Sequence, residues 1–246
     1  MGQADLHIHS NVGDGTASIE AILERAEQLG LDLVAVTDHD TLEGSLAARE
    51  LAARRNLRVG VVPGVEVTTR QGHLLALWVE RPVASRCPLA ETIAAVHRQG
   101  GACIVSHPMS WLSNSVSLRS LRAVVETGDA AVRLDGIETL NPTLPGRVTR
   151  AAARAFQRRH GLPQTGGSDA HCLAAVGSAV TLFEGRTGDD LRRALAGGRT
   201  RPAQLFSVRL ADMELLAFMR QNLRSNLARR KLPLPLGGLL RNIVRR

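Results

Sequence analysis

Two histidines that lie two residues apart, His7 and His9, are the first side chains in this sequence that could do chemistry. They belong to the short apolar run "DLHIHS", and residues i and i+2 of a strand point to the same face. Both imidazoles would then project to one side, as two ligands of one metal ion do. Taken alone, the pair is equally compatible with a chance arrangement on a surface.

Other residues that can bind a metal ion also follow short apolar runs. "TDHD" follows one such run, Glu66 ends "VVPGVE", His107 ends "CIVSH", and "GGSDAH" carries Asp169 and His171. The residues of this kind are His7, His9, Asp38, His39, Asp40, Glu66, His73, His107, Glu138, Asn141, Asp169 and His171.

Each of these residues has a structural alternative. Asp38 could cap the following helix, and His73 could be a hydrogen-bonded core residue. The joint pattern is harder to explain in that way, because so many buried charges need partners. The sequence therefore predicts a site for several metal ions. Imidazole and carboxylate ligands without thiolate favour Zn, Mn or Fe.

Strands and helices alternate in the order that such a site requires. Strands are expected at residues 4–10, 31–39, 58–67, 73–79, 102–108, 135–141, 162–171 and 178–184. Helices are expected at residues 16–30, 41–56, 89–101, 147–161 and 187–198, with Gly30 closing the first. This alternation indicates parallel βαβ units, arranged either as a barrel or as an open doubly wound sheet. A barrel of such units would place functional residues at the C-terminal ends of its strands.

Charge is distributed unevenly along the 246 residues. Residues 215–246 contain eight basic residues and no acidic one, which leaves 23 of the 31 basic residues to balance all 23 acidic residues in the body. The tail has an amphipathic helical pattern, and contact with an anionic surface is one expectation for it. A helix that covers the body is the other.

The cysteines and the lengths of the apolar runs indicate the cellular compartment in which the protein is expected. The three cysteines are far apart and form no CxxC pair, which favours a reduced, cytoplasmic protein. No run of about 18 apolar residues is present, so no transmembrane segment and no signal peptide are predicted.

The motifs resemble those of the PHP (polymerase and histidinol phosphatase) family over about residues 4–205. They are "DLHIHSNVGDG", "VAVTDHDT", "PGVEV", "GHLLAL", "IVSHP", "GIETLN" and "GSDAH". The resemblance implies an α/β fold, a distorted (β/α)7 TIM-like barrel. It also implies that the protein binds two or three divalent metal ions and uses them to hydrolyse phosphate esters. We expect this domain at residues 1–210 and a basic helical C-terminal tail at 211–246.

The resemblance also implies a set of ligands for three ions. The first ion would be bound by His7, His9, Glu66 and Asp169, the second by Asp14, His39 and His171, and the third by Glu66, His73 and His107. Asp38, His39, Glu66 and His107 are the expected catalytic residues. Asp38 would orient His39 or a neighbouring group, while Asp40 would cap the next helix.

The implied reaction is attack of a metal-activated hydroxide on phosphorus. The expected substrate is a small phosphate ester: a nucleotide, a nucleoside bisphosphate or a short oligonucleotide. The 3′,5′-nucleoside bisphosphate phosphatase branch is the most similar, although the helical insertion and the arginine after "HP" that mark that branch are missing here. Arg70, Asn141 and Arg147 are the candidate substrate contacts.

Two alternatives of other kinds remain. One is a metal-binding accessory module without catalysis, and the other is a phosphatase of the histidinol-phosphate type. The amidohydrolase class with a bridging carboxylated lysine is excluded, because Lys231 is the only lysine. A long nucleic-acid groove is not expected, since aromatic residues make up only 2% of the chain and the body carries no net charge. Trp111 could stack on a base, but the favoured expectation for it is a partly buried anchor.

Overall fold

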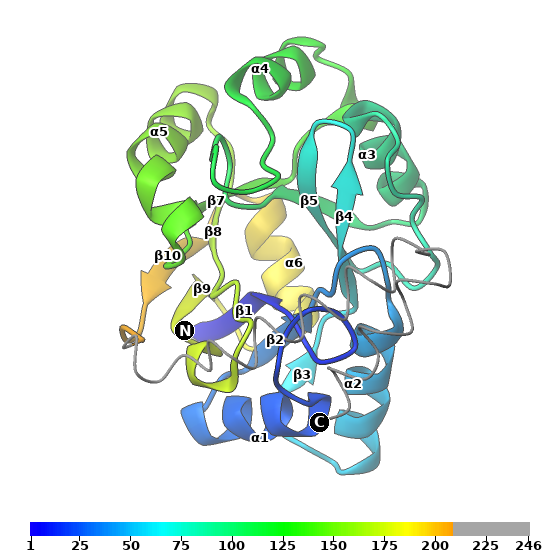
Figure 1. The fold of residues 1–246 in the computed structure, drawn as a ribbon, viewed down its shortest axis with the longest axis vertical. Helices are drawn as coiled ribbons and strands as arrows, with labels where there is room; N and C mark the ends of the chain where they lie inside the picture. Colours follow the sequence, from blue (N-terminus) through cyan, green and yellow to red (C-terminus); the bar gives the residue numbers. More distant parts are fainter. Residues whose placement is uncertain (209–246) are drawn as a thin grey trace, which may run out of the picture.

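In the computed structural model, which describes residues 1–208, the strands form two five-stranded sheets with helices around them (Figure 1). The first sheet has the order β10-β9-β1-β2-β3, and the second β4-β5-β6-β7-β8. The strands are β1 (Gly2–Ile8), β2 (Leu33–Val36), β3 (Gly60–Val61), β4 (Gly64–Thr69), β5 (Gly72–Leu77), β6 (Ala102–Val105), β7 (Gly136–Leu140), β8 (Gln164–Gly166), β9 (Ala179–Phe183) and β10 (Arg201–Gln204). The helices are α1 (Ile19–Leu29), α2 (Glu43–Arg54), α3 (Leu89–Arg98), α4 (Leu118–Glu126), α5 (Leu144–His160), α6 (Gly188–Ala196) and the 3₁₀ turns η1 (Ala130–Val132) and η2 (Leu173–Ala175).

The sheets are mixed, so the expectation of parallel βαβ units is met only in part. β1, β2 and β3 pair in parallel, as do β6, β7 and β8, whereas β4–β5, β5–β6, β1–β9 and β9–β10 are antiparallel. The strand expected at 58–67 is divided into β3 and β4 around Pro63, which has no N–H to donate to a ladder. The helix α4 and the strand β10 were not predicted.

The described strands do not form the continuous ring of a closed barrel. The two sheets meet instead at short contacts, such as the isolated parallel bridge between His39 and Glu66. At another junction Thr181 Oγ1 on β9 contacts both the N–H and the carbonyl of Gly166 on β8. The expected distorted (β/α)7 barrel is therefore found as an α/β fold of two sheets.

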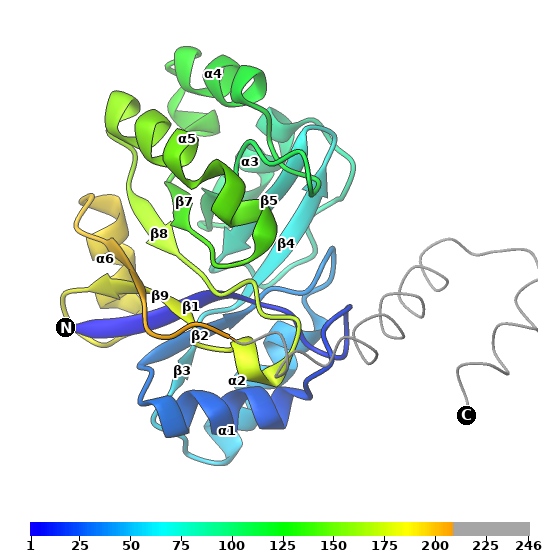
Figure 2. The ribbon, with the colours of Figure 1, turned by 60° about the vertical axis from the view of Figure 1, so that its left-hand side comes forward.

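Apolar side chains fill the space between the two sheets and the space beneath the helices. Leu6, Ala35, Leu75 and Ile104 belong to one buried cluster that draws on strands of both sheets and on α6. A second cluster joins the first sheet to α1 and α2, and a third joins the second sheet to α3 and α4. Figure 2 shows α1 and α2 at one end of the molecule and α4 and α5 at the other.

Local signals set the ends of several elements. The predicted C-cap Gly30 is confirmed, with a left-handed φ of 69° and backbone N–H bonds to the last turn of α1. α6 begins with a capping box between Thr187 and Asp190. Gly72 starts β5 at φ 134°, where a Cβ atom would approach the Ser115 and Val116 backbone to 2.3 Å. Only glycine fits this turn between β4 and β5.

A buried carboxylate ties the ends of β1 and β2 together. Asp38 accepts hydrogen bonds from the backbone N–H of Ser10 at 2.7 Å and from its hydroxyl at 2.6 Å. Gly44, in the first turn of α2, lies so close that a Cβ atom there would stand 2.2 Å from Asp38 Oδ2. The close packing of this glycine fixes the turn that follows His7 and His9.

The structure tests the predictions about membrane spans and about the cap at Asp40, but not the prediction about the C-terminal tail. The expected helical tail at 211–246 lies outside the described residues. Among the helices of residues 1–208, none is long and apolar enough to cross a membrane.

Asp40 does not cap α2, contrary to the sequence prediction, because its Oδ1 accepts the backbone N–H of Thr68 on β4 at 2.7 Å. The residue before α2 is Leu42, which makes no side-chain cap.

The substitution Gly44→Ala should lower the free energy of unfolding by about 1–3 kcal/mol, because the added methyl group overpacks the Asp38 carboxylate. At an unconstrained helix position the same change would stabilise the fold by about 0.5–1 kcal/mol. Urea titration measures the difference. The matched control is Gly188→Ala in the first turn of α6, where the nearest atom to a new Cβ is 3.9 Å away. Equal changes in the free energy of unfolding at both positions would contradict the proposed close packing of Gly44 against Asp38.

Candidate metal centre

The carboxylate of Glu66, on β4, lies in the middle of five imidazoles and is only 1% exposed. Its Oε2 is 3.4 Å from His7 Nε2, 3.3 Å from His9 Nε2 and 3.2 Å from His39 Nδ1. Its Oε1 is 3.2 Å from both His73 Nδ1 and His107 Nε2. One carboxylate thus faces side chains contributed by β1, β5 and the segments that follow β1, β2 and β6.

A second carboxylate, Asp169, approaches the same histidines from the loop after β8. Its Oδ1 is 3.5 Å from His7 Nε2, 3.4 Å from His9 Nε2 and 3.6 Å from His171 Nδ1. Asp169 has a left-handed φ of 51°. Non-glycine residues seldom adopt this conformation, so the strained backbone is a feature of the site.

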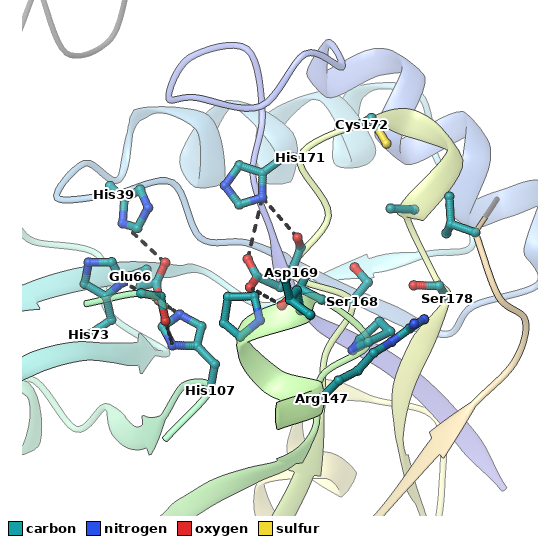
Figure 3. Close-up of a pocket in the computed structure, with 17 residues that line it drawn as sticks. His39, Glu66, His73, His107, Arg147, Ser168, Asp169, His171, Cys172 and Ser178 are labelled. Atoms are coloured by element: carbon teal, nitrogen blue, oxygen red, sulfur yellow. Dashed lines mark hydrogen bonds and ion pairs between the residues drawn. The ribbon is translucent and has the colours of Figure 1, made fainter. Parts of the chain in front are cut away.

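A third carboxylate, Asp14, comes from the turn after β1. Its oxygens lie 3.5 Å from His9 Nδ1, 3.6 Å from His39 Nε2 and 3.7 Å from His171 Nε2. The structure therefore brings together all nine residues of the ligand set implied by the sequence resemblance. Figure 3 shows six of the nine projecting toward one cavity.

The separations within this cluster fit metal binding better than direct hydrogen bonding. Distances of 3.2–3.7 Å exceed those of ordinary N–H···O bonds. They are close to the separation of about 3.4 Å between two ligands of a tetrahedral ion with bonds of about 2.1 Å. Several ligand atoms are buried without a hydrogen-bond partner: His7 Nε2, His9 Nδ1 and Nε2, His39 Nδ1, His73 Nδ1 and Glu66 Oε2. Divalent ions would satisfy these atoms.

Spatial grouping divides the cluster into overlapping sets. These sets are His9, Asp14, His39 and His171; His7, His9 and Glu66; His7, His107 and Asp169; and His39, Glu66 and His73. The buried donors suggest a site for more than one ion. The sets differ in detail from those implied by the resemblance, because His107 also groups with Asp169 and His39 with Glu66.

The pKa values show how strongly the carboxylates and imidazoles depend on one another. Burial by itself disfavours charge on His7 and His9, yet neighbouring carboxylates outweigh it. They hold the pKa of His7 well above its usual value, and they raise the pKa of His9 to about 10. Burial also disfavours charge on Glu66, but the surrounding imidazoles keep its pKa well below normal. The carboxylates therefore stay ionised and require positive charge beside them.

Glu138 on β7 orients two of the candidate ligands. Its Oε1 lies 3.1 Å from His7 Nδ1, and its Oε2 accepts the backbone N–H of His107 at 2.8 Å. Asn141 Nδ2 donates to Glu138 Oε2 at 2.9 Å and to Asp169 Oδ2 at 3.1 Å. A carboxylate on the second nitrogen of a histidine fixes the ring and increases its basicity as a ligand. The sequence placed Glu138 at a strand end but assigned it no role.

Further polar residues hold the cluster from outside. Ser106 Oγ donates to Glu66 Oε1 at 2.8 Å, and Ser115 Oγ lies 2.9 Å from His107 Nδ1. Asp5 is fully buried and accepts the backbone N–H groups of Ser168 at 3.0 Å and Gly177 at 2.8 Å. Burial raises the pKa of Asp5 to about 6. These residues were missed because a single sequence gives no sign of which serine or aspartate faces a ligand.

Asp38, which the sequence resemblance placed among the catalytic residues, is fully buried, and both its oxygens accept hydrogen bonds from Ser10. Burial raises its pKa, and the positive charge on His9 opposes this rise. It therefore acts as a positioning residue for the turn that carries Asp14.

The three candidate substrate contacts separate in the structure. Arg147, in the first turn of α5, lines the cavity. Arg70 does not line it, and its Nε donates to the carbonyl of Arg86 at 3.0 Å. Asn141 is buried behind Asp169 and serves to position that residue. The interpretation of Trp111 as a partly buried anchor is wrong, because this residue is 81% exposed.

His97, on α3, has a structural role. Its Nε2 lies 2.7 Å from Asp135 Oδ2, and its Nδ1 lies 2.9 Å from the carbonyl of Ala131. Asp135 in turn accepts the backbone N–H of Cys103 at 2.8 Å. These bonds attach α3 to the loop before β7, outside the metal cluster.

The metal cluster opens into a cavity of about 520 Å³. Its walls include His39, Glu66, His73, His107, Asp169 and His171 on one side and Pro142, Leu144, Pro145, Cys172, Ala175 and Val208 elsewhere. Such a cavity is large enough for a small organic molecule. A polar floor beneath largely apolar walls suits a substrate with an anionic group at one end.

Comparisons with known proteins agree with this geometry. A family described as "PHP domain" matches residues 5–154, and one described as "PHP-associated" matches residues 150–200. The uncharacterized protein MJ1587 of Methanocaldococcus jannaschii is 30% identical over 150 residues, which cover 56% of this chain and 81% of that protein. A phosphoribosyl 1,2-cyclic phosphate 1,2-diphosphodiesterase of Eggerthella lenta is 46% identical over 82 residues, which cover 31% of this chain and only 30% of the enzyme.

Among solved structures, a two-domain protein from Bacteroides vulgatus has a similar fold. It is described as containing a predicted PHP-like metal-dependent phosphoesterase. It superimposes with a TM-score of 0.68 at 20% identity, over 89% of this chain and 69% of the other. At this identity the likeness concerns the fold alone.

Metal binding should release protons at neutral pH. The raised pKa values of His7 and His9 mean that the metal-free protein holds protons that a ligating imidazole must lose. Affinity for Mn²⁺ or Zn²⁺ should therefore increase with pH until those protons are gone. Calorimetry in buffers of different ionisation enthalpy measures the release. The control is His160→Gln on α5, which lies outside the cluster and should release as many protons as the wild type. Binding heats that are independent of the buffer would contradict the expectation.

Replacing the orienting carboxylate in Glu138→Gln should weaken metal binding by about 10- to 100-fold, the usual cost of losing such a partner. Glutamine keeps the size of the side chain but loses the charge that supports His7. Metal titration under chelator competition measures the affinity, and circular dichroism checks that the fold is retained. Glu126→Gln on the exposed surface of α4 is the control. A folded Glu138→Gln protein with unchanged affinity would exclude the orienting role.

Proposed function

The chain belongs to the PHP domain family, and from this premise we propose that it is a metal-dependent hydrolase of small phosphate esters. The observation that carries the proposal is the buried Glu66 carboxylate among five imidazoles at the floor of an open cavity. A purely structural ion would not need an opening of this size.

We assign the nine clustered residues as ligands of two or three ions. His7, His9, Glu66 and Asp169 would bind one ion, Asp14, His39 and His171 a second, and Glu66, His73 and His107 a third. Buried ligand atoms support this assignment, since His7 Nε2, His9 Nε2 and Glu66 Oε2 have no hydrogen-bond partner among residues 1–208. When bound, such ions lower the pKa of a water molecule toward neutral and neutralise charge on a phosphate.

Neighbouring side chains of the protein hold the ligands in the fixed positions that this chemistry needs. Glu138 and Asn141 hold His7 and Asp169 in fixed directions, so the ligand atoms do not have to reorganise during a reaction. Four of the candidate ligands that line the cavity are histidines, namely His39, His73, His107 and His171. The apolar walls exclude water from the organic part of that substrate, which strengthens the electrostatic interactions at the floor.

The substrate is best described as a small phosphate ester, and nucleotides and nucleoside bisphosphates are the first compounds to test. The cavity volume suits a molecule of this size. The Eggerthella relative acts, by its name, on a ribosyl phosphate diester, but the match covers less than a third of that enzyme. We also propose that this protein is related to the 3′,5′-nucleoside bisphosphate phosphatase branch of the family.

The complete donor set and the open cavity favour an enzyme over an accessory module without catalysis. An accessory domain would need neither a substrate-sized cavity beside the ions nor an unpaired cation in its wall. No feature of the described cavity selects the amine of histidinol phosphate, since the carboxylates of its wall, Glu66 and Asp169, already lie against the imidazoles of the cluster.

Replacing a central ligand should remove both metal and activity. His9→Ala and Asp169→Ala are each expected to lower turnover of a phosphate ester by at least about 10²-fold, the scale for loss of one transition-state stabiliser. A screen with Mn²⁺ against phosphomonoesters, nucleotides, 3′,5′-bisphosphates and histidinol phosphate measures turnover, and elemental analysis measures bound metal. His160→Ala, on α5 outside the cluster, is the control.

Activity that survives complete removal of metal from the wild-type protein would contradict the mechanism. Full metal content with no turnover of any ester in the screen would favour the accessory module.

A further inference from the structure

One helix at the cavity carries an unbalanced positive charge. α5 (Leu144–His160) contains five arginines, Arg147, Arg150, Arg154, Arg158 and Arg159, and no acidic residue. The body of the chain as a whole has equal numbers of basic and acidic residues, so this charge is a local feature. It begins at the catalytic cavity, because Arg147 forms part of the cavity wall (Figure 3).

The spacing of these arginines places four of them along one face. Arg147, Arg150, Arg154 and Arg158 are three or four residues apart, and such positions are neighbours on a helix surface. With a rise of 1.5 Å per residue, the stripe extends about 16 Å from the cavity. Figure 2 shows α5 running from the centre of the molecule toward the end where α4 lies.

The charges of this stripe are not neutralised by carboxylates of the described residues. The arginines of residues 1–208 that form ion pairs are Arg49, Arg55, Arg58, Arg133, Arg186 and Arg193. None of them is on α5. Arg147 also lies in the first turn of its helix, where the helix dipole disfavours a cation. Burial and the neighbouring Arg154 and Arg147 lower the pKa of Arg150, as expected for crowded like charges.

We propose that the arginine stripe of α5 binds the phosphate backbone of a short single-stranded nucleic acid whose end occupies the metal cluster. The inference rests on the proposed function, because it takes the cavity to be the site of hydrolysis. A polyanion explains why the stripe starts in the cavity wall at Arg147 and continues outward through the half-buried Arg150 to the exposed Arg154 and Arg158. A membrane surface could lie against the exposed arginines but could not reach the cavity floor.

Binding without turnover tests the surface directly. A fluorescent tetranucleotide is titrated into metal-free full-length protein in chelator, and anisotropy is measured from 50 to 300 mM salt. The double variant Arg154→Gln/Arg158→Gln should weaken binding about five- to tenfold at low salt, as two exposed charge contacts allow. Two lost contacts should also reduce the slope of log affinity against log salt by about 1.4. The control Arg54→Gln/Arg98→Gln removes two exposed charges from α2 and α3.

Turnover tests the link to the catalytic site. With metal restored, the double variant should lower kcat/KM for the tetranucleotide at least fivefold more than kcat/KM for a mononucleotide. The control variant should change neither value. If the variant binds the tetranucleotide less tightly than wild type but no protein hydrolyses any ester, the stripe is supported and the proposed function fails.

Two results would overturn the inference while the proposed function stands. One is hydrolysis of mononucleotides with tetranucleotide binding that is equal in wild type and in the α5 variant. The other is loss of binding to phosphatidylglycerol vesicles in the α5 variant without any effect on the tetranucleotide, which would assign the stripe to a membrane surface.

Discussion

A buried carboxylate surrounded by imidazoles is the interaction on which the rest of this structure depends. Glu66 is almost inaccessible to water and still remains ionised, because nearby histidines hold its pKa well below the normal range. An isolated carboxylate in such a place would become neutral instead. The site therefore needs positive charge from ions or protons, and the surrounding fold keeps its donors in position for them.

The two sheets contribute to this arrangement in different ways. β1 supplies His7 and the turn after it, while β4 and β7 supply Glu66 and Glu138. Buried carboxylates outside the cluster, Asp5 and Asp38, hold the loops by accepting backbone N–H groups. Each of these groups costs free energy to bury, and each is almost fully hydrogen-bonded. Polar ties of this kind fix the ligand directions more rigidly than apolar packing can.

The surface around the cavity differs chemically from its floor. The floor is crowded with carboxylates and imidazoles, the walls are largely apolar, and α5 brings to the rim Arg147, which forms no ion pair within residues 1–208. This arrangement assigns the binding of ions, the exclusion of water and the attraction of an anion to different parts of the cavity. The zero net charge of the body conceals this division, since net charge reports a sum and recognition depends on local fields.

The sequence by itself determined the chemistry of the centre. His7 and His9 stand two residues apart in an apolar run, and Glu66, His107 and Asp169 end or follow other apolar runs, so strand periodicity and strand ends were enough to identify them as one group. Only the tertiary structure decided what lies behind and beside these residues. Glu138 rather than Asp38 supports a ligand, Arg147 rather than Arg70 reaches the cavity, and the strands form two mixed sheets. The physical reason is that ligand types and strand periodicity are local properties, whereas hydrogen-bond partners and sheet pairing depend on which distant segments meet.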